Sequence, residues 1–546
     1  MTVTVVEGSE EATPTAAAAE APPAAAPTEE SSDLTGRDRL VWNVVMSWAG
    51  HAVFLVAGFI MPRQIDRSIG QVSLGVWDFA WTAVNYFYLA QIGVGVSVNR
   101  YVARYRAAGD REGLSRMISS VMILQMIAAV IVLAATAASA WWLPEFFGYR
   151  LQEEAVVARD VIALLGTSVA IRMAVQAYSG VVTGCHRWDL HNLLNSGAYA
   201  VTVAAMMIVL ASGGGLVAIS IVYVIGTILN EIARIALAYH VCPELRVSPR
   251  LASYTEARAL LAFGAKLSTL DIMKIVTAQL TSLLVFGQIG VATLAIFSRM
   301  GALIRHTENL LAKFSLTLTP TASSLQGSGR DAEVQALLVE STRYSAYITW
   351  PILIGLAIVG DDVLRLWMGP EYDPRMVLSL MALASLLPIT QQPIATILVG
   401  LNRHGRFAAL NVVTSIAAFI GSVAALRYFH WELLGLAAVT LGVSNVSAVW
   451  IAADTCRRLS IPVRQYFFRS YAGPIACMAP FAAGLVMLDL FVDSPLLTLV
   501  LAGVLAGGVV GPLYWFYVVP PGVRVTLLNR MNAKIGELRL ALQPGA

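Results

Sequence analysis

The chain has 546 residues, of which 57% are hydrophobic and only 13% are charged, and its net charge is +3. Soluble proteins carry about 25% charged residues, so this composition excludes an ordinary water-soluble protein. The mean hydropathy of +0.69 and the near-neutral charge instead predict a membrane protein with no nucleic-acid partner.

The chain begins with a polar segment, residues 1–35, that is rich in Ala, Pro, Thr and Glu. Such a composition cannot build a packed core, so we expect a disordered cytoplasmic tail. The segment has neither the basic start nor the apolar stretch of a secretory signal. The first membrane helix is therefore expected to direct insertion.

Apolar segments then follow one another from Leu40 to Tyr517, separated mostly by short polar loops. A segment that crosses about 30 Å of hydrocarbon must satisfy its own backbone as a helix of about 20 residues. We therefore predict an all-α polytopic membrane protein with about fourteen transmembrane helices. The expected spans are 40–61, 73–98, 117–143, 155–184, 191–211, 217–240, 259–286, 291–318, 344–359, 376–401, 407–426, 433–455, 471–492 and 495–517.

The Lys and Arg residues alternate in abundance from one loop to the next. With these spans, most of the 37 fall on the side of the two termini, as in the run Arg100, Arg104, Arg106 and Arg111. Because basic loops remain in the cytoplasm, we expect both termini there, in a multi-pass protein of the cytoplasmic membrane. Residues 519–546 have apolar and basic residues at helical spacing, which favours an amphipathic helix on the cytoplasmic surface or against a loop.

An internal repeat divides the chain. Gly70, Leu74 and Trp77 align with Gly290, Leu294 and Phe297 at a period of about 220 residues, and a second match joins the segments that start at Gly184 and Gly400. Six expected helices separate the copies, so the halves should be related by a pseudo-two-fold axis along the membrane normal. We predict an N-lobe (36–240), a linker (241–258), a C-lobe (259–455) and two further helices (456–518).

These segments resemble a known family. The stretch 93–119 (GVGVSVNRYVARYRAAGDREGLSRMIS), together with VVTGCHRWDLHN and ILVGLNRHGRFAALN, is similar to Wzx-type polysaccharide flippases of the MOP superfamily, which also contains lipid II flippases and MATE drug antiporters. The resemblance implies two six-helix lobes around a central cavity that opens to either side in turn. It also implies transport of a lipid-linked oligosaccharide, with membrane lipids and other components of polysaccharide export as partners.

The eighth expected span carries several ionisable residues, which are costly inside a membrane unless they face protein or water. Arg299, His306 and Lys313 recur every seven residues and form one face. A basic face of this kind would attract an anionic pyrophosphate headgroup. The alternative is that Lys313 reaches the interface and His306 pairs with a neighbouring helix. Arg305 and Glu308 are interpreted as a local pair.

Other spans also carry polar residues that could line a cavity or bind a coupling ion. Lys274 and Asp271, with Lys266, lie on the seventh span; Asn43 and His51 share a face of the first; Asp78 and Asn85 share a face of the second. Cavity lining, or ion coupling by Asp78, Asp271 or Glu308, is one interpretation. The other is that these residues join helices structurally. Arg172, on the fourth span, is interpreted mainly as a structural partner.

Several motifs are absent from the sequence. It contains no phosphate-binding loop of the GxxxxGK[ST] type, no HExxH or paired CxxC motif and no GxSxG motif, so we expect neither an enzyme nor a metal or organic cofactor. The predicted function is a flippase for a polyprenyl-pyrophosphate-linked oligosaccharide or a related anionic glycolipid. The alternatives are a cation-coupled drug antiporter and, ranked lower, a membrane glycan polymerase or ligase.

Overall fold

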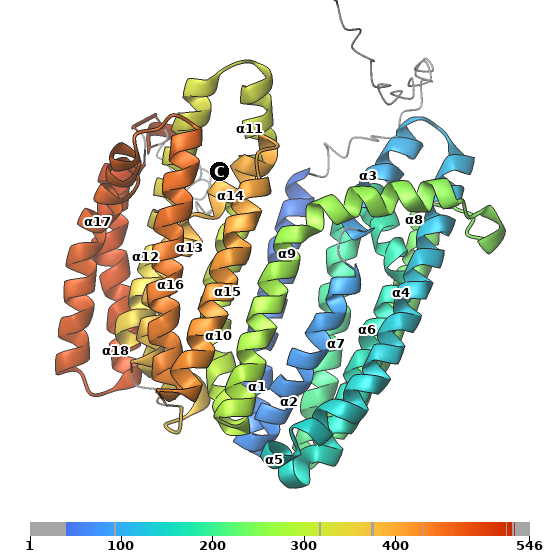
Figure 1. Ribbon diagram of the computed structural model, residues 1–546, viewed down its shortest axis with the longest axis horizontal. Coiled ribbons are helices and arrows are strands. Elements are labelled where there is room, and N and C mark those ends of the chain that lie inside the picture. The colour runs from blue at the N-terminus through green and yellow to red at the C-terminus, as the bar shows by residue number, and fades with distance from the viewer. Residues whose placement is uncertain are drawn as a thin grey trace, which may run out of the picture.

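The computed structural model describes residues 40–91, 94–315, 318–372, 376–429, 431–519 and a few positions up to 529, and these residues form helices joined by short turns (Figure 1). Expectations for the tail 1–35 and for most of 519–546 lie outside them. Side chains are described except in a few places, the longest of which is 259–271 in the seventh expected span.

The first half of the chain forms one bundle. Its helices pack mainly through the pairs α4–α6, α6–α8 and α1–α7. The elements are α1 (Leu40–Ile69), α2 (Gln71–Asn85), η2 (Tyr86–Gln91), α3 (Val94–Ala107), α4 (Arg111–Phe146), α5 (Gly148–Leu151), η3 (Gln152–Glu154), α6 (Ala155–Gly184), α7 (Trp188–Ala211) and α8 (Leu216–Val241).

The second half forms another bundle, in which α12, α13 and α16 pack together. Its elements are η4 (Pro249–Leu251), α9 (Tyr254–Gln288), α10 (Val291–Ser315), α11 (Leu318–Gly327), α12 (Asp331–Met368), α13 (Val377–Thr390), α14 (Gln392–Gly400), α15 (Gly405–Arg427) and α16 (Glu432–Arg458). The chain ends with α17 (Val463–Phe491), α18 (Pro495–Leu505), η5 (Ala506–Val510), α19 (Gly511–Leu513) and η6 (Tyr514–Val518). Both α17 and α18 pack on α12.

Ten of the described helices are long and apolar enough to cross a membrane. Their outer faces expose large apolar side chains such as Ile131 on α4, Val201 and Ile208 on α7 and Leu490 on α17. In lipid these faces carry no hydration cost. The chain is therefore a multi-pass membrane protein, whereas the count of fourteen spans stays a prediction.

The expected spans that are missing from these ten correspond to α2 with η2 and α3, and to α6, α9 and α10. Each carries ionisable residues within its length, for example Asp78 on α2, Arg172 on α6 and Arg299 on α10. Such residues lower the apolarity of a segment and are retained where they face protein or a polar cavity. The least apolar helices thus indicate where to look for function.

Three pairs of left-handed backbone positions support the internal repeat. Gly70 and Gly290 have φ of 91° and 154° and precede α2 and α10. Gly109 and Gly329 both have φ of 67° and follow α3 and α11, and His186 (φ 57°) and Asn402 (φ 54°) follow α6 and α14. Because left-handed conformations are uncommon outside such turns, their recurrence at a nearly constant offset shows that the two bundles share a backbone plan.

The described helices differ from two of the expected spans. The tenth expected span, 376–401, is interrupted between α13 and α14 at Gln391, which lies between Pro388 and Pro393. The ninth expected span was to end at residue 359, which is wrong, because α12 continues to Met368 after a kink at Val359. Helix propensity and packing against α13 carry the helix past the end of the apolar segment.

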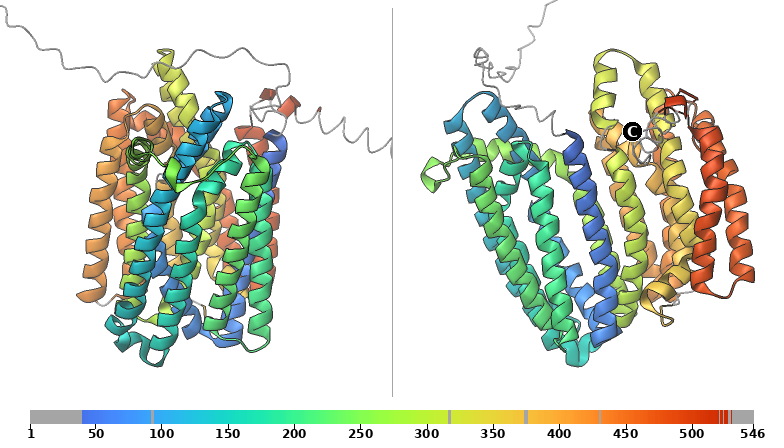
Figure 2. Two further views of the ribbon diagram at one scale, coloured as in Figure 1. Left: turned by 90° about the vertical axis from the view of Figure 1, so that its right-hand side faces the viewer. Right: turned by 180° about the vertical axis from the view of Figure 1, so that it is seen from behind.

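The two bundles meet at one end and diverge toward the other (Figure 1, Figure 2). At the meeting end α2 packs on α10 and α9, and α1 packs on α12. The tips formed by α3 in the first bundle and α11 in the second lie at the diverging end (Figure 1). Helix α9 starts at that same end, lies across the first bundle and then turns down between the two (Figure 1).

The segment that leads into α9 is attached to the first bundle by serines of α4. The Oγ atoms of Ser115, Ser119 and Ser120 accept hydrogen bonds from the backbone N–H groups of Arg246 (3.2 Å), Ser248 (3.1 Å) and Ser253 (2.8 Å). An ion pair between Arg111 and Glu244 (2.7 Å) reinforces this contact. We call this arrangement the serine clamp.

A phenol completes the clamp. The hydroxyl of Tyr105 donates to Glu256 Oε1 at 3.2 Å. Burial and the Glu256 carboxylate raise the pKa of Tyr105 above its usual range, so the phenol stays protonated and keeps donating. The linker therefore moves with the first bundle, and any hinge between the bundles lies further along α9.

Candidate functional site

The end where the bundles meet contains a buried ion pair. Arg299 Nη2 on α10 lies 2.6 Å from Asp78 Oδ1 on α2, and the two side chains are 8% and 10% exposed. The pair comes from opposite bundles, because Asp78 follows the turn at Gly70 and Arg299 follows the equivalent turn at Gly290. The repeat thus places these two charges on helices that follow corresponding turns in the two halves.

This ion pair is only partly satisfied. Arg299 Nε and Nη1 are buried and have no hydrogen-bond partner among the described residues. Desolvation of two charges is costly, and their attraction offsets it fully only when the remaining donors are also bonded. The pair is therefore specific in partner choice but modest in net stabilisation. Those two properties suit a contact that must form and break.

Aromatic packing and hydrogen bonds surround the pair. Phe79 stacks on Phe286 of α9 at 4.0 Å between ring centroids. The Trp367 indole N–H donates to the carbonyl of Phe59 at 2.6 Å, which links α12 to α1. Arg150 of α5 donates to the carbonyls of Gly287 (3.1 Å) and Gln288 (2.6 Å), at the end of α9. We call this set of contacts the closed end.

The residues of the expected basic face on α10 have different environments. Arg299 belongs to the closed end, and His306 stacks on Phe59 of α1 at 5.4 Å. The side chain of Lys313 is outside the described residues. Arg305 is exposed, and it makes no ion pair with a described residue. Its guanidinium folds back along α10, since a methyl group on Gly301 would come within 2.9 Å of Arg305 Nη1.

The structure separates the other candidate residues. The side chains of Lys274, Asp271 and Lys266 lie outside the described set. Glu308 is half-buried, and its backbone carbonyl accepts from Gln392 Nε2 at 3.5 Å. The roles of these residues in binding or ion coupling stay predictions.

The polar residues of the first and second spans also differ from one another. Asn43 has a structural contact, since its side chain accepts from Asp189 N (2.9 Å) and donates to the His186 carbonyl (3.3 Å), where α7 begins. Asn85 is the last residue of α2 and is half-buried. His51 lines a cavity inside the first bundle.

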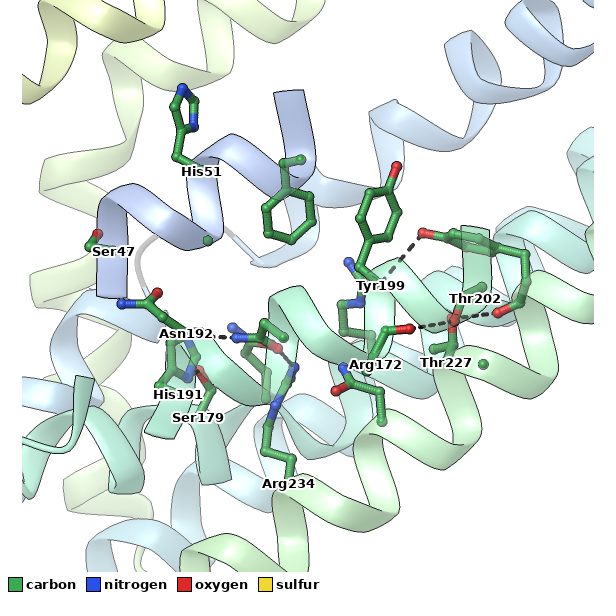
Figure 3. A pocket seen from close by; sticks show the side chains of 18 residues that line it. Ser47, His51, Arg172, Ser179, His191, Asn192, Tyr199, Thr202, Thr227 and Arg234 are labelled. Atoms are coloured by element: carbon green, nitrogen blue, oxygen red, sulfur yellow. Dashed lines mark hydrogen bonds between the residues drawn. The ribbon is translucent and has the colours of Figure 1, made fainter. Parts of the chain in front are cut away.

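That cavity has a volume of about 540 Å³ (Figure 3). We call it the N-half cavity. Its walls come from four helices: Ser47, Gly50, His51 and Phe54 of α1; Arg172, Gln176 and Ser179 of α6; His191, Asn192, Asn195, Ala198, Tyr199 and Thr202 of α7; and Tyr223, Gly226, Thr227, Asn230 and Arg234 of α8. Most of these side chains are polar, although the cavity lies between membrane helices.

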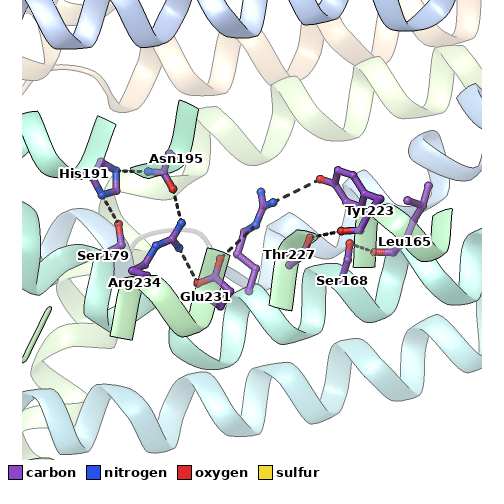
Figure 4. A network of polar contacts seen from close by, with 10 residues as sticks. Leu165, Ser168, Ser179, His191, Asn195, Tyr223, Thr227, Glu231 and Arg234 are labelled. Atoms are coloured by element: carbon purple, nitrogen blue, oxygen red, sulfur yellow. Dashed lines mark hydrogen bonds and ion pairs between the residues drawn. The ribbon is translucent and has the colours of Figure 1, made fainter. Parts of the chain in front are cut away.

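A polar network runs along one wall of the N-half cavity (Figure 4). Glu231 Oε2 lies 2.9 Å from Arg234 Nη1, and Arg234 Nη2 donates to Asn195 Oδ1 at 2.5 Å. Asn195 bonds in turn to His191 Nε2 at 3.0 Å, and His191 Nδ1 lies 3.4 Å from Ser179 Oγ. The network holds α6, α7 and α8 together through side chains that are almost fully buried at its centre.

Arg172 lies at the far end of this network and is held loosely. Its Nε is 3.9 Å from Glu231 Oε1, and its Nη2 is 3.5 Å from the Tyr223 hydroxyl. The Arg172 side chain is 33% exposed, against 6% for that of Arg234. Arg172 therefore has structural partners, as expected for this residue, but both contacts are long and weak. Its guanidinium can also bind a ligand in the cavity.

Sequence reasoning did not identify Glu231, Arg234, Asn195 or His191 as site residues. A signal was present, because Glu231 and Arg234 are an i, i+3 pair of opposite charge inside an otherwise apolar helix. An intramembrane pair of this kind marks a protein-facing polar site. Its connection to Arg172 could not be read from the sequence, because the two helices are joined only through tertiary packing.

Comparisons with known proteins agree with this architecture. The family model described as a polysaccharide biosynthesis protein matches residues 110–378. No curated protein sequence matches the chain. An inward-facing multidrug resistance transporter of the MATE family, in the MOP superfamily, aligns with a TM-score of 0.65 and 14% identity, over 77% of this chain and 98% of that chain.

Two further solved structures are similar. The lipid II flippase MurJ, in an inward closed conformation, aligns with a TM-score of 0.66 and 12% identity, over 88% of this chain and all of that one (100%). A MOP superfamily transporter from Pyrococcus furiosus aligns with a TM-score of 0.57 and 13% identity, over 78% of this chain and 96% of that chain. At these identities the alignments establish the fold alone, and they support the predicted all-α architecture.

Proposed function

We propose that this chain is an alternating-access flippase for a polyprenyl-pyrophosphate-linked oligosaccharide or a related anionic glycolipid. The match of residues 110–378 to a polysaccharide biosynthesis family model and the fold shared with MOP superfamily transporters support this proposal. The headgroup crosses between the bundles while the lipid tail remains in the bilayer. The observation that carries this proposal is the closed end, where a buried and partly satisfied ion pair joins two halves that diverge at the other end.

The direction in which the protein faces follows from its charges. Arg104, Arg106, Arg111 and Arg250 lie at the diverging end, on α3, α4 and the linker. Basic residues remain on the cytoplasmic side, so the diverging end faces the cytoplasm and the closed end faces outward. The higher TM-score to an inward-facing MATE structure (0.65) than to an outward-facing one (0.57) supports the same orientation.

Substrate transfer requires the closed end to open. The Asp78–Arg299 pair and the Trp367–Phe59 hydrogen bond then break, and the bundles close at the opposite end. Ion pairs and single hydrogen bonds can exchange partners at modest net cost. Arg305, exposed beside this end, and the other basic residues of α10 supply cationic donors for the pyrophosphate.

A glycolipid suits the chain better than a cationic drug. Two arginines line the N-half cavity and one glutamate beside it pairs with them, and this positive balance disfavours a cation. The MurJ alignment also extends over 88% of the chain, against 77% for the MATE structure. No nucleotide-binding motif occurs in the sequence, so an ion gradient, the membrane potential or the substrate gradient would drive transport.

The test is headgroup accessibility in proteoliposomes. A fluorescent polyprenyl-pyrophosphate glycan is placed in one leaflet, and its movement is followed with and without the protein. We expect protein-dependent translocation, slowed by Arg305→Gln and unaffected by the exposed Arg427→Gln on α15. Absence of translocation, together with export of cationic dyes under a proton or sodium gradient by the same preparation, would replace the proposal with drug antiport.

A further inference from the structure

The N-half cavity has a charge that its own residues do not balance. Its ionisable groups are Arg172, Arg234 and the neighbouring Glu231, together with His51 and His191. With both histidines neutral, two positive charges meet one negative charge. An unbalanced cation between membrane helices is costly unless an anion or water accompanies it.

The distances assign the surplus charge to Arg172. Arg234 lies 2.9 Å from Glu231 and donates to Asn195, so it neutralises the carboxylate and both of its terminal nitrogens have partners, although its Nε has none among the described residues. Arg172 is 3.9 Å from the same carboxylate, its side chain is one-third exposed (33%), and its Nε has no hydrogen-bond partner among the described residues. The free cation therefore faces the cavity.

The cavity also presents neutral groups that lack partners. Asn192 Nδ2 is a buried donor and Asn230 Oδ1 a buried acceptor, and neither is bonded to a described residue. Buried polar atoms are normally satisfied, so these two favour a ligand that both accepts and donates hydrogen bonds. Hydroxyl groups do both.

One wall of the cavity is aromatic. Phe54 of α1 and Tyr199 of α7 stack with ring centroids 4.7 Å apart, and Tyr223 lies edge-on to Trp81 at 5.4 Å. Phe54 and Tyr199 therefore add apolar ring surface to a lining that is otherwise mostly polar. The volume of about 540 Å³ falls within the roughly 300–1,000 Å³ of small-molecule sites, which is far more than a single halide ion needs.

We propose that the N-half cavity binds an acidic sugar, with its carboxylate on Arg172, its hydroxyls on Asn192 and Asn230, and its ring against Phe54 and Tyr199. One free arginine matches the single charge of a carboxylate, whereas a pyrophosphate would need more cations than the cavity offers. The sugar is either a residue of the transported glycan or a free sugar acid. The first case rests on the proposed flippase function, and the second does not.

Binding is tested on the full chain in nanodiscs by calorimetric titration with glucuronate, glucose and inorganic phosphate. We expect glucuronate to bind saturably and Arg172→Gln to weaken it about tenfold or more, because a charge-assisted hydrogen bond is lost. Arg159→Gln removes a charge from the exposed part of the same helix and should leave binding unchanged. Because Arg234 still neutralises Glu231, Arg172→Gln is expected to fold, and Arg172→Lys should show intermediate affinity.

Three results would overturn the proposal. They are no saturable glucuronate binding, equal binding by the wild type and Arg172→Gln, and phosphate binding as tight as that of glucuronate with the same dependence on Arg172. The last result would describe a general anion site with no selectivity for a sugar.

A transport experiment then separates the two sources of the sugar. Two polyprenyl-pyrophosphate glycans that differ only in a terminal glucuronate or glucose are compared in proteoliposomes. If Arg172→Gln slows only the acidic glycan, the sugar belongs to the cargo. If both glycans move equally well, a free sugar acid is the ligand. If neither glycan moves with wild-type protein while glucuronate still binds, the flippase function fails and the binding site stands.

Discussion

Asp78 of α2 and Arg299 of α10 lie 221 positions apart in the sequence, and their side chains meet at 2.6 Å across the two halves of the protein. Each follows a turn with a left-handed glycine, Gly70 or Gly290, at equivalent points of the internal repeat. The ion pair therefore joins α2 and α10, two helices that follow corresponding turns in the two halves.

Breaking this pair should be costly in the conformation described here. In Asp78→Asn the buried Arg299 loses its counter-charge, and we expect the free energy of unfolding to fall by about 3–5 kcal/mol. Transport should also fall, and the double variant Asp78→Arg, Arg299→Asp should recover part of both. Thermal unfolding and the proteoliposome assay provide the measurements.

A matched control is the exposed pair Arg159–Asp160 on α6, whose side chains are 46% and 47% exposed. An exposed pair of this kind contributes at most about 1 kcal/mol, so Asp160→Asn should change little. Equal effects of Asp78→Asn and Asp160→Asn would show that the buried pair has no special role.

The Trp367 hydrogen bond should control the balance between the two conformations. Trp367→Phe keeps the ring and removes the donor to Phe59, so the closed end loses about 0.5–1.5 kcal/mol and opens more often. Spin labels at Ala108 and Ser328, in the tips after α3 and α11, measure the distance between the diverging ends. The native cysteines are buried, so labelling should favour the introduced ones.

Trp350→Phe is the matched control for that experiment. Trp350 donates to Leu386 within the second bundle, so its loss should reduce stability without changing the tip-to-tip distance. We expect a shorter-distance population in Trp367→Phe alone. The same distance distribution in both variants would contradict a role for Trp367 in the conformational balance.

A glycine permits the close approach of α2 and α10. A Cβ on Gly75 would lie 2.2 Å from the carbonyl oxygen of Val291, which is backbone and cannot move aside cheaply. Gly75→Val should therefore separate the helices, destabilise the closed end by about 1–3 kcal/mol and raise hydrogen exchange at residues 71–80 and 291–300. Gly58→Val on α1 has nothing within 4 Å of the added Cβ and should show neither effect.

The serine clamp should hold the linker on the first bundle. Replacing Ser115, Ser119 and Ser120 together with alanine removes three acceptors for backbone N–H groups of 246–253. Each bond contributes about 0.5–1.5 kcal/mol, so proteolysis and hydrogen exchange of this segment should increase strongly while the helix bundle stays folded. Ser328→Ala, where the serine bonds only to its own helix, is the control. Unchanged protection of 242–253 in the triple variant would rule out the clamp.

The class of the protein could be predicted from the sequence because hydrophobic length and charge placement act locally. Each apolar segment must satisfy its own backbone as a helix, and Pro388 and Pro393 interrupt α13 and α14 through their own covalent structure. The repeat could be recognised in the sequence from a few residues such as Gly70 and Gly290. The structure adds two further pairs of residues with positive φ, Gly109 with Gly329 and His186 with Asn402. The resemblance to polysaccharide flippases rested on segments of the same kind.

The partners of the charged residues depended on tertiary structure. In the sequence Arg299, His306 and Lys313 share one helical face, but packing pairs Arg299 with Asp78 and stacks His306 on Phe59. Similarly, Arg172, Glu231 and Arg234 come from two helices that no local pattern connects, and only their packing leaves Arg172 without a full counter-charge. Helical periodicity determines which side chains share a face, whereas the charge that a face meets is decided by the helix packed against it.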